Sequence, residues 1–175
     1  MTAKRLFDVV FAALGLIVLS PLMLAIAVVI RLDSPGPVLY RGVRVGRGGK
    51  HFRMLKFRTM VPDAERIGAS STTKDDPRLT RVGMFLRRHK LDELPQLINV
   101  LRGEMSFVGP RPQVPWVVDL YSEEERQLLS VQPGITDHAS LRFSNEEEIL
   151  QGAADPDAAY FELIAPEKTR LGLEY

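Results

Sequence analysis

The stretch VVFAALGLIVLSPLMLAIAVVI, residues 9–30, contains 22 residues without one charged side chain. At 1.5 Å per residue, an α-helix of this length reaches across the roughly 30 Å hydrocarbon core of a bilayer. On hydropathy alone, the segment is therefore typical of a single transmembrane anchor. A secretory signal peptide fits less well, because the apolar run is too long and no small-x-small cleavage site follows it.

Two features of this stretch instead favour a re-entrant hairpin, whose arms enter and leave the bilayer by the same face. Basic residues stand on both sides of the run, so the positive-inside bias selects neither end as the cytoplasmic one. Pro21 has no N–H for the carbonyl of Ile17, so the helix must kink or break there, and the Ser20 hydroxyl can satisfy the freed carbonyl. The flanking basic residues are Lys4 and Arg5 before the run, and Arg31, Arg41, Arg44 and Arg47 after it.

The lengths on either side of the proline agree with this geometry. About 11 residues precede Ser20 and about 9 follow Pro21, which gives arms of roughly 14 to 16 Å, or half a bilayer each. Because many true spanning helices tolerate a proline, a single spanning helix stays open beside the hairpin. Residues 1–32 are predicted to form a membrane segment with a helix break at Ser20 and Pro21. Residues 33–175 are predicted to form one separate domain, as the length of the chain suggests.

The composition of the 175-residue chain excludes several kinds of chemistry. Without cysteine, the chain has no disulfide framework, thiolate zinc site, iron–sulfur cluster or cysteine nucleophile. His51, His89 and His138 do not have the helical spacing of metal ligands, which disfavours an imidazole metal site. A metal ion would therefore be a hard cation bound by carboxylate oxygen.

Charge is distributed unevenly, although the net charge is only +1. Residues 1–111 carry 19 basic and 9 acidic side chains, whereas residues 112–175 carry 4 basic and 13 acidic ones. Such a bipolar chain concentrates anion-binding chemistry in its first part. Seven lysines and arginines lie between positions 41 and 58 without an acid, and they form either a solvated or lipid-facing strand or a phosphate-binding wall.

Beyond the apolar stretch, the pattern predicts an α+β fold, a small mixed domain of helices and short strands. Residues 38–46 and 51–60 alternate apolar with basic residues around a glycine turn, which predicts a two-stranded hairpin. Residues 105–112, MSFVGPRP, predict a short strand and a proline-bracketed turn that fixes Arg111. Helices are expected near residues 62–69, 79–90, 91–103, 116–131 and 157–170. The apolar face of the helix at 116–131 belongs either to the core or to a helix lying on lipid.

Asp92 and Glu93 are the candidate reactive pair. In LDELPQLINVLRG, residues 91–103, Asp92 suits an N-cap position and Pro95 suits the first turn, so the simplest interpretation is that both carboxylates only stabilise a helix N-terminus. The basic neighbours favour a second interpretation, because they would keep the carboxylates ionised and able to hold Mg²⁺ together with phosphate. These neighbours are Arg87, Arg88, Lys90, Arg102 and Arg111.

A basic cluster, a carboxylate pair and a membrane segment together suggest phosphoryl-group transfer at the bilayer surface, with a carboxylate as nucleophile. Two other classes stay open. One is a membrane-anchored protein that binds anionic lipid or a nucleotide without turnover. The other is a basic nucleic-acid module on a membrane tether. No nucleic-acid partner is expected, because aromatic residues are not interleaved on the cationic face.

Four motifs follow the Ser-Pro-interrupted stretch in a fixed order. They are KFRTM (56–60), DDPRLTRVGMFLRR (75–88), LDELPQLINVLRGEMSFVGPRP (91–112) and QPGIT (132–136). In this order they resemble the bacterial sugar transferases, or monotopic phosphoglycosyl transferases, over nearly all of residues 4–175. The resemblance implies transfer of sugar 1-phosphate from a UDP-sugar donor to a polyprenyl (undecaprenyl) phosphate acceptor, with release of UMP.

The resemblance also implies roles for individual residues. Asp92 would be the nucleophile that forms a phosphosugar-enzyme intermediate, and it would bind Mg²⁺. Glu93 would complete the catalytic dyad by helping to place the metal or the acceptor. Lipid phosphate would then attack the intermediate, which gives ping-pong order. Residues that match family positions associated with the substrate phosphate site are Lys56, Arg58, Arg87 and Arg111.

The same resemblance implies a location. The segment 1–32 would be re-entrant, and the catalytic domain 33–175 would rest with interfacial amphipathic helices on the cytoplasmic face of the bacterial inner membrane, in contact with membrane lipid. The donor sugar, the pathway and a homodimeric state stay open. The stretch DHASLRFSNEEEIL departs from the family pattern, so nucleotide or sugar contacts around residues 137–143 are not assigned. The ending LGLEY is shorter than usual for the family, which suggests a minimal member or a trimmed chain.

Overall fold

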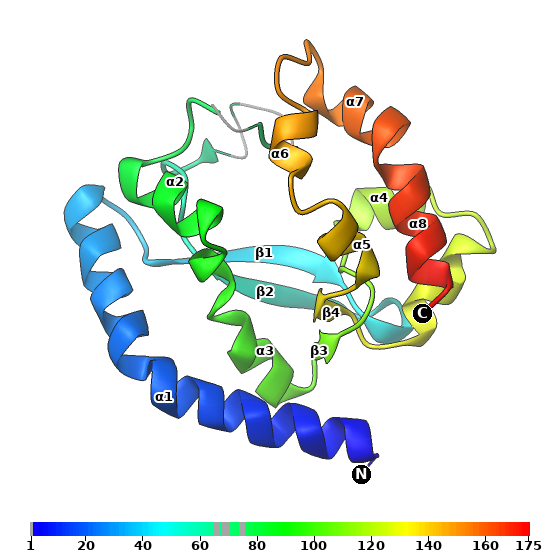
Figure 1. The fold of residues 1–175 in the computed structure, drawn as a ribbon, viewed down its shortest axis with the longest axis horizontal. Coiled ribbons are helices and arrows are strands. Elements are labelled where there is room, and N and C mark those ends of the chain that lie inside the picture. Colours follow the sequence, from blue (N-terminus) through cyan, green and yellow to red (C-terminus); the bar gives the residue numbers. More distant parts are fainter. Residues whose placement is uncertain (1, 65–66, 68–70, 74–75) are drawn as a thin grey trace.

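The structure, a computed structural model, describes residues 2–64, 67, 71–73 and 76–175. Within these residues the chain folds into helices around two small sheets (Figure 1), so the mixed class predicted from the sequence is confirmed. The α-helices are α1 (Ala3–Asp33), α2 (Arg81–Arg88), α3 (Gln96–Arg102), α4 (Pro115–Asp119), α5 (His138–Arg142), α6 (Glu146–Ile149), α7 (Pro156–Leu163) and α8 (Ala165–Leu173). The strands are β1 (Leu39–Val45), β2 (His51–Phe57), β3 (Ser106–Val108) and β4 (Gly134–Thr136), and the 3₁₀ helices are η1 (Arg47–Gly49), η3 (Leu91–Glu93) and η4 (Glu125–Ser130).

Helix α1 continues through Pro21 as one 31-residue helix, which is visibly bent (Figure 1). Pro21 cannot donate to the carbonyl of Ile17, and the Ser20 hydroxyl donates to that carbonyl instead, at 2.8 Å. Because this bond satisfies the freed carbonyl, the helix bends without breaking. The predicted helix–break–helix at residues 1–32 is thus corrected: the described part of this segment is one bent helix and not two separate arms.

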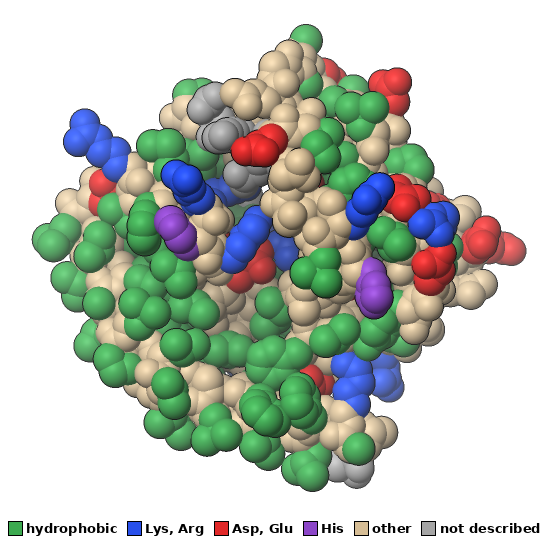
Figure 2. Space-filling model, in the orientation of Figure 1, with side chains coloured by type: hydrophobic (Ala, Val, Ile, Leu, Met, Phe, Trp, Pro, Cys, Tyr) green, Lys and Arg blue, Asp and Glu red, His purple; other side chains and the backbone are tan. Residues whose placement is uncertain are grey.

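Most of the apolar surface of α1 is exposed. The helix is long and apolar enough to cross a membrane, with a mean hydropathy of 2.8, yet only 11% of its apolar window is buried in the protein. Figure 2 shows hydrophobic side chains covering the part of the surface that α1 forms. The large exposed ones include Leu6, Phe7, Phe11, Leu14, Ile17, Val18, Leu24, Val28 and Leu32. An apolar surface of this extent marks a membrane or protein interaction site.

The first turns of α1 are bonded to the rest of the domain. Arg5 donates to the carbonyls of Val100 and Leu101 in α3, at 2.5 and 2.8 Å. The carboxylate of Asp8, which is buried, accepts from the amide of Phe107 in β3 at 3.1 Å. These bonds fix the beginning of the apolar helix against α3 and β3.

Two hydrophobic clusters show that both halves of α1 also belong to the core. The first consists of Ala12, Phe52, Met54, Leu97, Val100 and Met105. The second consists of Ile26, Ile30, Phe57 and Leu86. Strand β2 contributes Phe52 and Met54 to the first cluster and Phe57 to the second, and α3 lies between α1 and the β1–β2 hairpin (Figure 1).

The two sheets join motifs that are separate in the sequence. Strands β1 and β2 pair antiparallel from Leu39 opposite Phe57 to Val45 opposite His51, and η1 occupies the predicted glycine turn, so the predicted hairpin is confirmed. Strands β3 and β4 pair in parallel, with Ser106 opposite Gly134. The second pairing places MSFVGPRP beside QPGIT.

Three predicted helices are each replaced by two shorter elements, at residues 91–103, 116–131 and 157–170. In the second case, Ser122 and Glu125 each accept a hydrogen bond from the other's backbone amide, at 3.2 and 2.8 Å. This reciprocal capping starts a new turn after α4 ends. The predicted helix at 62–69 lies largely outside the described residues.

Candidate active site

Asp92 and Glu93 lie in the 3₁₀ turn η3, which directly follows α2. Between the two elements Lys90 adopts a left-handed φ of 55°, which turns the chain sharply. Helix α2 packs directly on the chain that leaves β2, because a Cβ at Gly83 would collide with the backbone carbonyl of Thr59. The turn that carries both carboxylates is therefore held close to the end of β2.

Neither carboxylate caps a helix. Helix α3 begins at Gln96 after Pro95, and neither α3 nor η3 receives a side-chain cap hydrogen bond. The prediction of Asp92 as the N-cap of a helix at 91–103 is therefore wrong, because Leu94 and Pro95 separate the carboxylates from the first turn of α3. Their contacts are instead with basic side chains.

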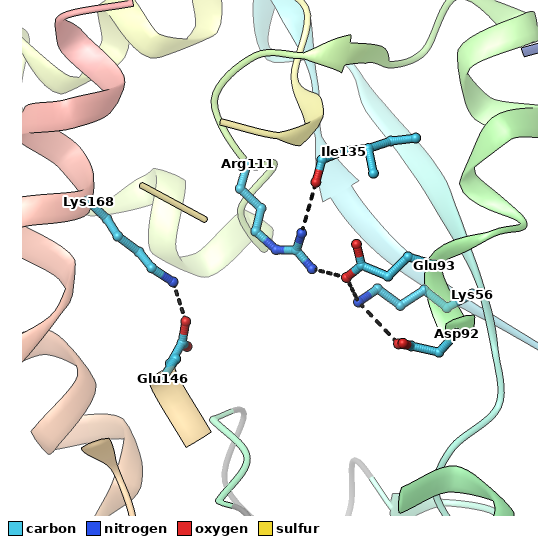
Figure 3. Close-up of polar contacts among 7 residues, drawn as sticks. All are labelled: Lys56, Asp92, Glu93, Arg111, Ile135, Glu146 and Lys168. Atoms are coloured by element: carbon cyan, nitrogen blue, oxygen red, sulfur yellow. Dashed lines mark hydrogen bonds and ion pairs between the residues drawn. The ribbon is translucent and has the colours of Figure 1, made fainter. Parts of the chain in front are cut away.

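Glu93 is held by two cations from distant parts of the sequence. Its Oε1 accepts from Lys56 Nζ of β2 at 2.8 Å and from Arg111 Nη2, in the loop after β3, at 2.5 Å (Figure 3). The structure thus brings together three predicted site residues from two motifs, Lys56 from the first and Glu93 and Arg111 from the two ends of the 91–112 motif. Charge-assisted hydrogen bonds of this kind fix both cations in place.

Asp92 points into the same space but is bonded differently (Figure 3). Its Oδ2 lies 3.7 Å from Lys56 Nζ, and the residue is 6% exposed. Its Oδ1 is buried without a hydrogen-bond partner among the described residues. A buried carboxylate oxygen left unpaired costs free energy until a ligand engages it, so Oδ1 of Asp92 is the atom at which a ligand or a reaction is expected.

The two neighbouring carboxyls have opposite pKa shifts. Burial alone would raise the pKa of Glu93, but Arg111 and Lys56 outweigh burial and hold that pKa well below its ordinary value. Burial raises the pKa of Asp92, against the opposing charge of Lys56. From the sequence, the basic neighbours were expected to keep both carboxylates ionised, and a lowered pKa is found for Glu93 only. Neighbouring carboxyls whose pKa values are shifted in opposite directions are characteristic of catalytic pairs.

Arg111 is positioned by the close contact of β3 with β4. The backbones of Gly109 and Gly134 touch, and a Cβ at Gly134 would collide with the amide nitrogen of Gly109. The amide of Arg111 donates to Asp137 Oδ2 at 3.2 Å, and its Nη1 donates to the carbonyl of Ile135 at 3.5 Å. Asp137 was not predicted as a site residue, and its place directly after QPGIT is the only sequence signal for it.

The other two predicted basic residues are placed differently. Arg58 is buried and donates to the carbonyls of Ser34 and Pro35, just after α1, at 2.8 and 2.5 Å. It therefore holds the end of the apolar helix instead of joining the dyad. Arg87 of α2 is among the charges that oppose the raised pKa of Asp92, so it stays a candidate for contact with phosphate.

The carboxylates suit one kind of metal site. Across the described ranges, no three histidine, aspartate or glutamate side chains gather as ligands, so these residues form no closed cage. Mg²⁺ is commonly bound by one or two carboxylates, with substrate phosphates and water completing its shell. Oδ1 of Asp92 fits this requirement, whereas Oε1 of Glu93 is already shared by two cations.

A second ion pair, which was not predicted from the sequence, lies across the open space from Arg111 (Figure 3). Lys168 of α8 pairs with Glu146 of α6 (Figure 3). The only sequence signals for this pair are the acidic run at 146–148 and the scarcity of basic residues after position 111.

Fold and site together define a class of protein. Phosphoryl chemistry requires cations over the phosphate oxygens and an aligned attacking group. Lys56 and Arg111 supply the first, Asp92 supplies the second, and Figure 2 shows acidic and basic side chains together in the recess at the centre of this face. With the exposed apolar helix beside it, this arrangement defines a membrane-associated transferase of phosphate-containing groups.

Comparison with known proteins narrows the class. The bacterial sugar transferase family matches residues 1–166. A Bacillus subtilis protein named as an undecaprenyl-phosphate N-acetylgalactosaminyl 1-phosphate transferase is 46% identical over 124 residues, which cover 71% of this chain and 69% of that protein. The chain belongs to the bacterial sugar transferase family.

Two longer relatives match this chain over only part of their own length. The UDP-glucose:undecaprenyl-phosphate glucose-1-phosphate transferase of Escherichia coli is 45% identical over 146 residues, 79% of this chain and 30% of that protein. The UDP-N-acetylgalactosamine-undecaprenyl-phosphate N-acetylgalactosaminephosphotransferase of Aeromonas hydrophila is 44% identical over 141 residues, 79% of this chain and 33% of that protein. The chain therefore spans about a third of these two relatives.

Proposed function

We propose that this chain transfers sugar 1-phosphate from a UDP-sugar to undecaprenyl phosphate and so begins the synthesis of a membrane glycoconjugate. The names of its relatives support both the donor and the acceptor. The observation that carries the proposal is the unpaired, buried Oδ1 of Asp92 beside Lys56 and the Glu93–Arg111 pair. A carboxylate in this setting is suited to nucleophilic attack on a phosphorus whose charge the cations offset.

In the first half-reaction, a carboxylate oxygen of Asp92 forms a bond to the phosphorus next to the sugar. The bond from that phosphorus to the bridging oxygen breaks, and UMP leaves with the bridging oxygen and the electron pair. The sugar 1-phosphate stays on Asp92 as an acyl phosphate. Lys56 and Arg111 offset the charge on the non-bridging oxygens.

In the second half-reaction, a phosphate oxygen of the lipid attacks the same phosphorus. The bond between phosphorus and Asp92 breaks, which restores the carboxylate and releases a polyprenyl diphosphate sugar. Because UMP departs before the lipid phosphate reacts, the two substrates are used in ping-pong order.

Glu93 acts in this scheme as a positioning residue. One oxygen, Oε1, holds both Lys56 and Arg111, and a pKa well below the ordinary value keeps Glu93 anionic at neutral pH. The two cations therefore keep a fixed separation while the phosphorus is exchanged between oxygens.

Mg²⁺ is the metal that suits this chemistry. Asp92 would hold it together with the diphosphate oxygens of the donor, and the ion, when bound, neutralises diphosphate charge.

The proposed location is the cytoplasmic face of the bacterial inner membrane, with α1 entering and leaving the bilayer by one side. Arg5 and Arg58 bond the two ends of α1 to the same domain, whereas a helix that crossed the bilayer would place its ends on opposite sides. The bend at Pro21 and the basic flanks support this geometry. Trp116 of α4 is exposed, which supports a helix that rests on lipid.

The test is UMP release by the protein in nanodiscs with Mg²⁺, undecaprenyl phosphate and a panel of UDP-sugars. At least one donor should yield UMP, and Asp92→Asn should release it at least about 10³-fold more slowly, because the nucleophile is lost. Affinity for the donor measured without Mg²⁺ should stay within about threefold, since asparagine keeps the shape of the side chain. Asp119→Asn, at an exposed position of α4, serves as the matched control.

Two outcomes would contradict parts of the proposal. Full activity of Asp92→Asn would exclude Asp92 as the nucleophile, and so would sugar phosphate trapped on that variant in the absence of acceptor. Donor binding without UMP from any UDP-sugar would instead favour a membrane-anchored protein that binds anionic lipid or a nucleotide without turnover.

A further inference from the structure

A cavity of about 330 Å³ opens beside Arg111. Its walls come from the loop after β3 and from the chain between α4 and α8, and none of its lining residues belongs to α1, α2 or the β1–β2 hairpin. The volume lies at the small end of the roughly 300 to 1,000 Å³ range of ligand pockets. The polar lining residues include Gln113, Asp137, Ser140, Tyr160, Lys168 and Thr169.

Lys168 is fixed in the wall of this cavity by contacts on several sides. Its ammonium pairs with Glu146 and lies 5.3 Å from the centre of the Tyr160 ring and 5.9 Å from that of the Phe143 ring. Its side chain is only 14% exposed. A cation held by a carboxylate and two ring faces keeps one position, unlike an ordinary surface lysine.

The wall that carries Lys168 faces the reacting centre. Figure 3 shows the Lys168–Glu146 pair across the open space from Arg111. Burial would lower the pKa of Arg111, but Glu93 and, less strongly, Glu146 raise it, so the two walls lie within electrostatic reach of each other. Burial raises the pKa of Tyr160 to about 12, so its hydroxyl stays protonated at neutral pH.

The order of the proposed reaction decides which end of the donor belongs in the cavity. UMP leaves, and the lipid phosphate attacks, on the side of the phosphorus opposite its bond to Asp92. The two groups therefore occupy the same space one after the other, and that space must open toward the bilayer. The sugar stays bound through both half-reactions and needs a place of its own. The cavity shares Arg111 with the reacting centre and has no wall from α1.

We infer that this cavity holds the sugar ring of the donor and that Lys168, positioned by Glu146, determines which sugar is accepted. The inference rests on the proposed function. A hexose carries hydroxyl groups on its rim and C–H groups on its faces, which match an ammonium donor and the ring of Tyr160 respectively. A pocket built to bond a substrate hydroxyl discriminates strongly, because the wrong sugar leaves a buried polar group unpaired.

The experiment compares the whole chain in nanodiscs with two variants of α8, Lys168→Met and Arg170→Met. Arg170 is the matched control, because it lies on the same helix, pairs with Glu167 and Glu174 and is 57% exposed. For each protein, kcat/KM for UMP release is measured with UDP-glucose, UDP-galactose and their N-acetylamino counterparts. Inhibition by UMP reports separately on the nucleotide end.

Lys168→Met should lower kcat/KM for the preferred donor about tenfold or more. The ratio of the preferred donor to its epimer should shrink by the same factor, while the inhibition constant of UMP stays within about twofold. Arg170→Met should change neither quantity. If Lys168→Met fails to fold, as judged by thermal unfolding, Glu146→Gln replaces it and should shift the same ratio in the same direction.

Four results would overturn the inference. An equal loss with every donor would indicate a purely structural role for Lys168, and weaker UMP inhibition with unchanged donor ratios would place the nucleotide in the cavity. An active wild type with unmoved ratios would overturn this inference alone. A wild type that releases no UMP from any donor would overturn the proposed function and this inference with it.

Discussion

Two lysine–glutamate pairs face each other across the opening beside Asp92, and their surroundings differ. Lys56 and Glu93 have side chains that are 19% and 14% exposed, and Arg111 adds a second cation to Glu93. Lys168 is as well buried, but its other neighbours are aromatic rings, and Glu146 is 32% exposed. Together with Arg111, the first pair therefore presents two cations to a phosphate, whereas the second pair neutralises itself and presents a shaped wall. Lysine and glutamate thus bind charge in the first pair and form a fixed pocket wall in the second.

Replacing the two glutamates one at a time gives the largest expected contrast. Glu93→Gln should lower kcat for UMP release about 10²-fold, because Lys56 and Arg111 lose the anion that positions them both. Glu146→Gln should cost less than about tenfold with the preferred donor, as a partly exposed pair contributes little, and should act mainly on donor choice. Steady-state kinetics on both variants provide the measurement. Equal losses in kcat would mean that the two pairs have the same role in the reaction, which would contradict the difference described above.

The dyad side of the comparison can be sharpened by unfolding at different pH values. The pKa of Glu93 lies below its ordinary 4.5, so its ionised form stabilises the fold above that pH, and the contribution is lost as the pH falls toward the folded pKa. The pKa of Asp92 lies above its ordinary 3.8, so ionisation costs stability as the pH rises from there.

At pH 7, Glu93→Gln should therefore unfold at a lower temperature than wild type, with a loss of about 1 to 3 kcal/mol. Asp92→Asn should unfold at a higher temperature. Both differences should shrink as the pH falls below about 4. Thermal unfolding in one detergent at several pH values measures them, and shifts of the same sign in both variants would contradict the opposite pKa directions.

The smallest expected effect lies outside both pairs, in α1. Ser20→Ala removes the hydrogen bond to the carbonyl of Ile17 and should cost about 1 kcal/mol in detergent, with UMP release within about twofold for every donor. Ser20→Thr keeps a hydroxyl and is the matched control. A change in donor choice in Ser20→Ala would reveal coupling between α1 and the Lys168 wall.

The first pair lies in the part of the molecule that the sequence predicts well. Lys56, Asp92, Glu93 and Arg111 stand in compact motifs, and the alternation of residues around a glycine turn correctly predicts the β1–β2 hairpin. Local pattern is informative for this hairpin because its strands and its turn depend on near neighbours, whereas the roles expected of Lys56 and Arg111 come from the family resemblance.

The second pair could not be predicted, for a physical reason. Glu146 and Lys168 are 22 positions apart on separate short helices, so no periodicity relates them. Arg58 shows the same limit. The sequence does not distinguish an arginine that binds phosphate from one that bonds the end of α1, because the difference depends on where the helix ends in the fold. The bend at Pro21 depends likewise on a contact seen only in the fold, since the freed carbonyl of Ile17 accepts from the Ser20 hydroxyl.

Helix α1 supplies Ala12 to one core cluster and Ile26 and Ile30 to the other. A fragment that starts after Asp33 would uncover buried side chains such as Val100 and Leu86, so trimming the helix for solubility would remove part of the interior. The rest of the chain therefore cannot complete its core until α1 has packed against it. With α1 in the bilayer as proposed, insertion becomes a stage of folding, and the bilayer becomes part of the solvent against which stability is defined.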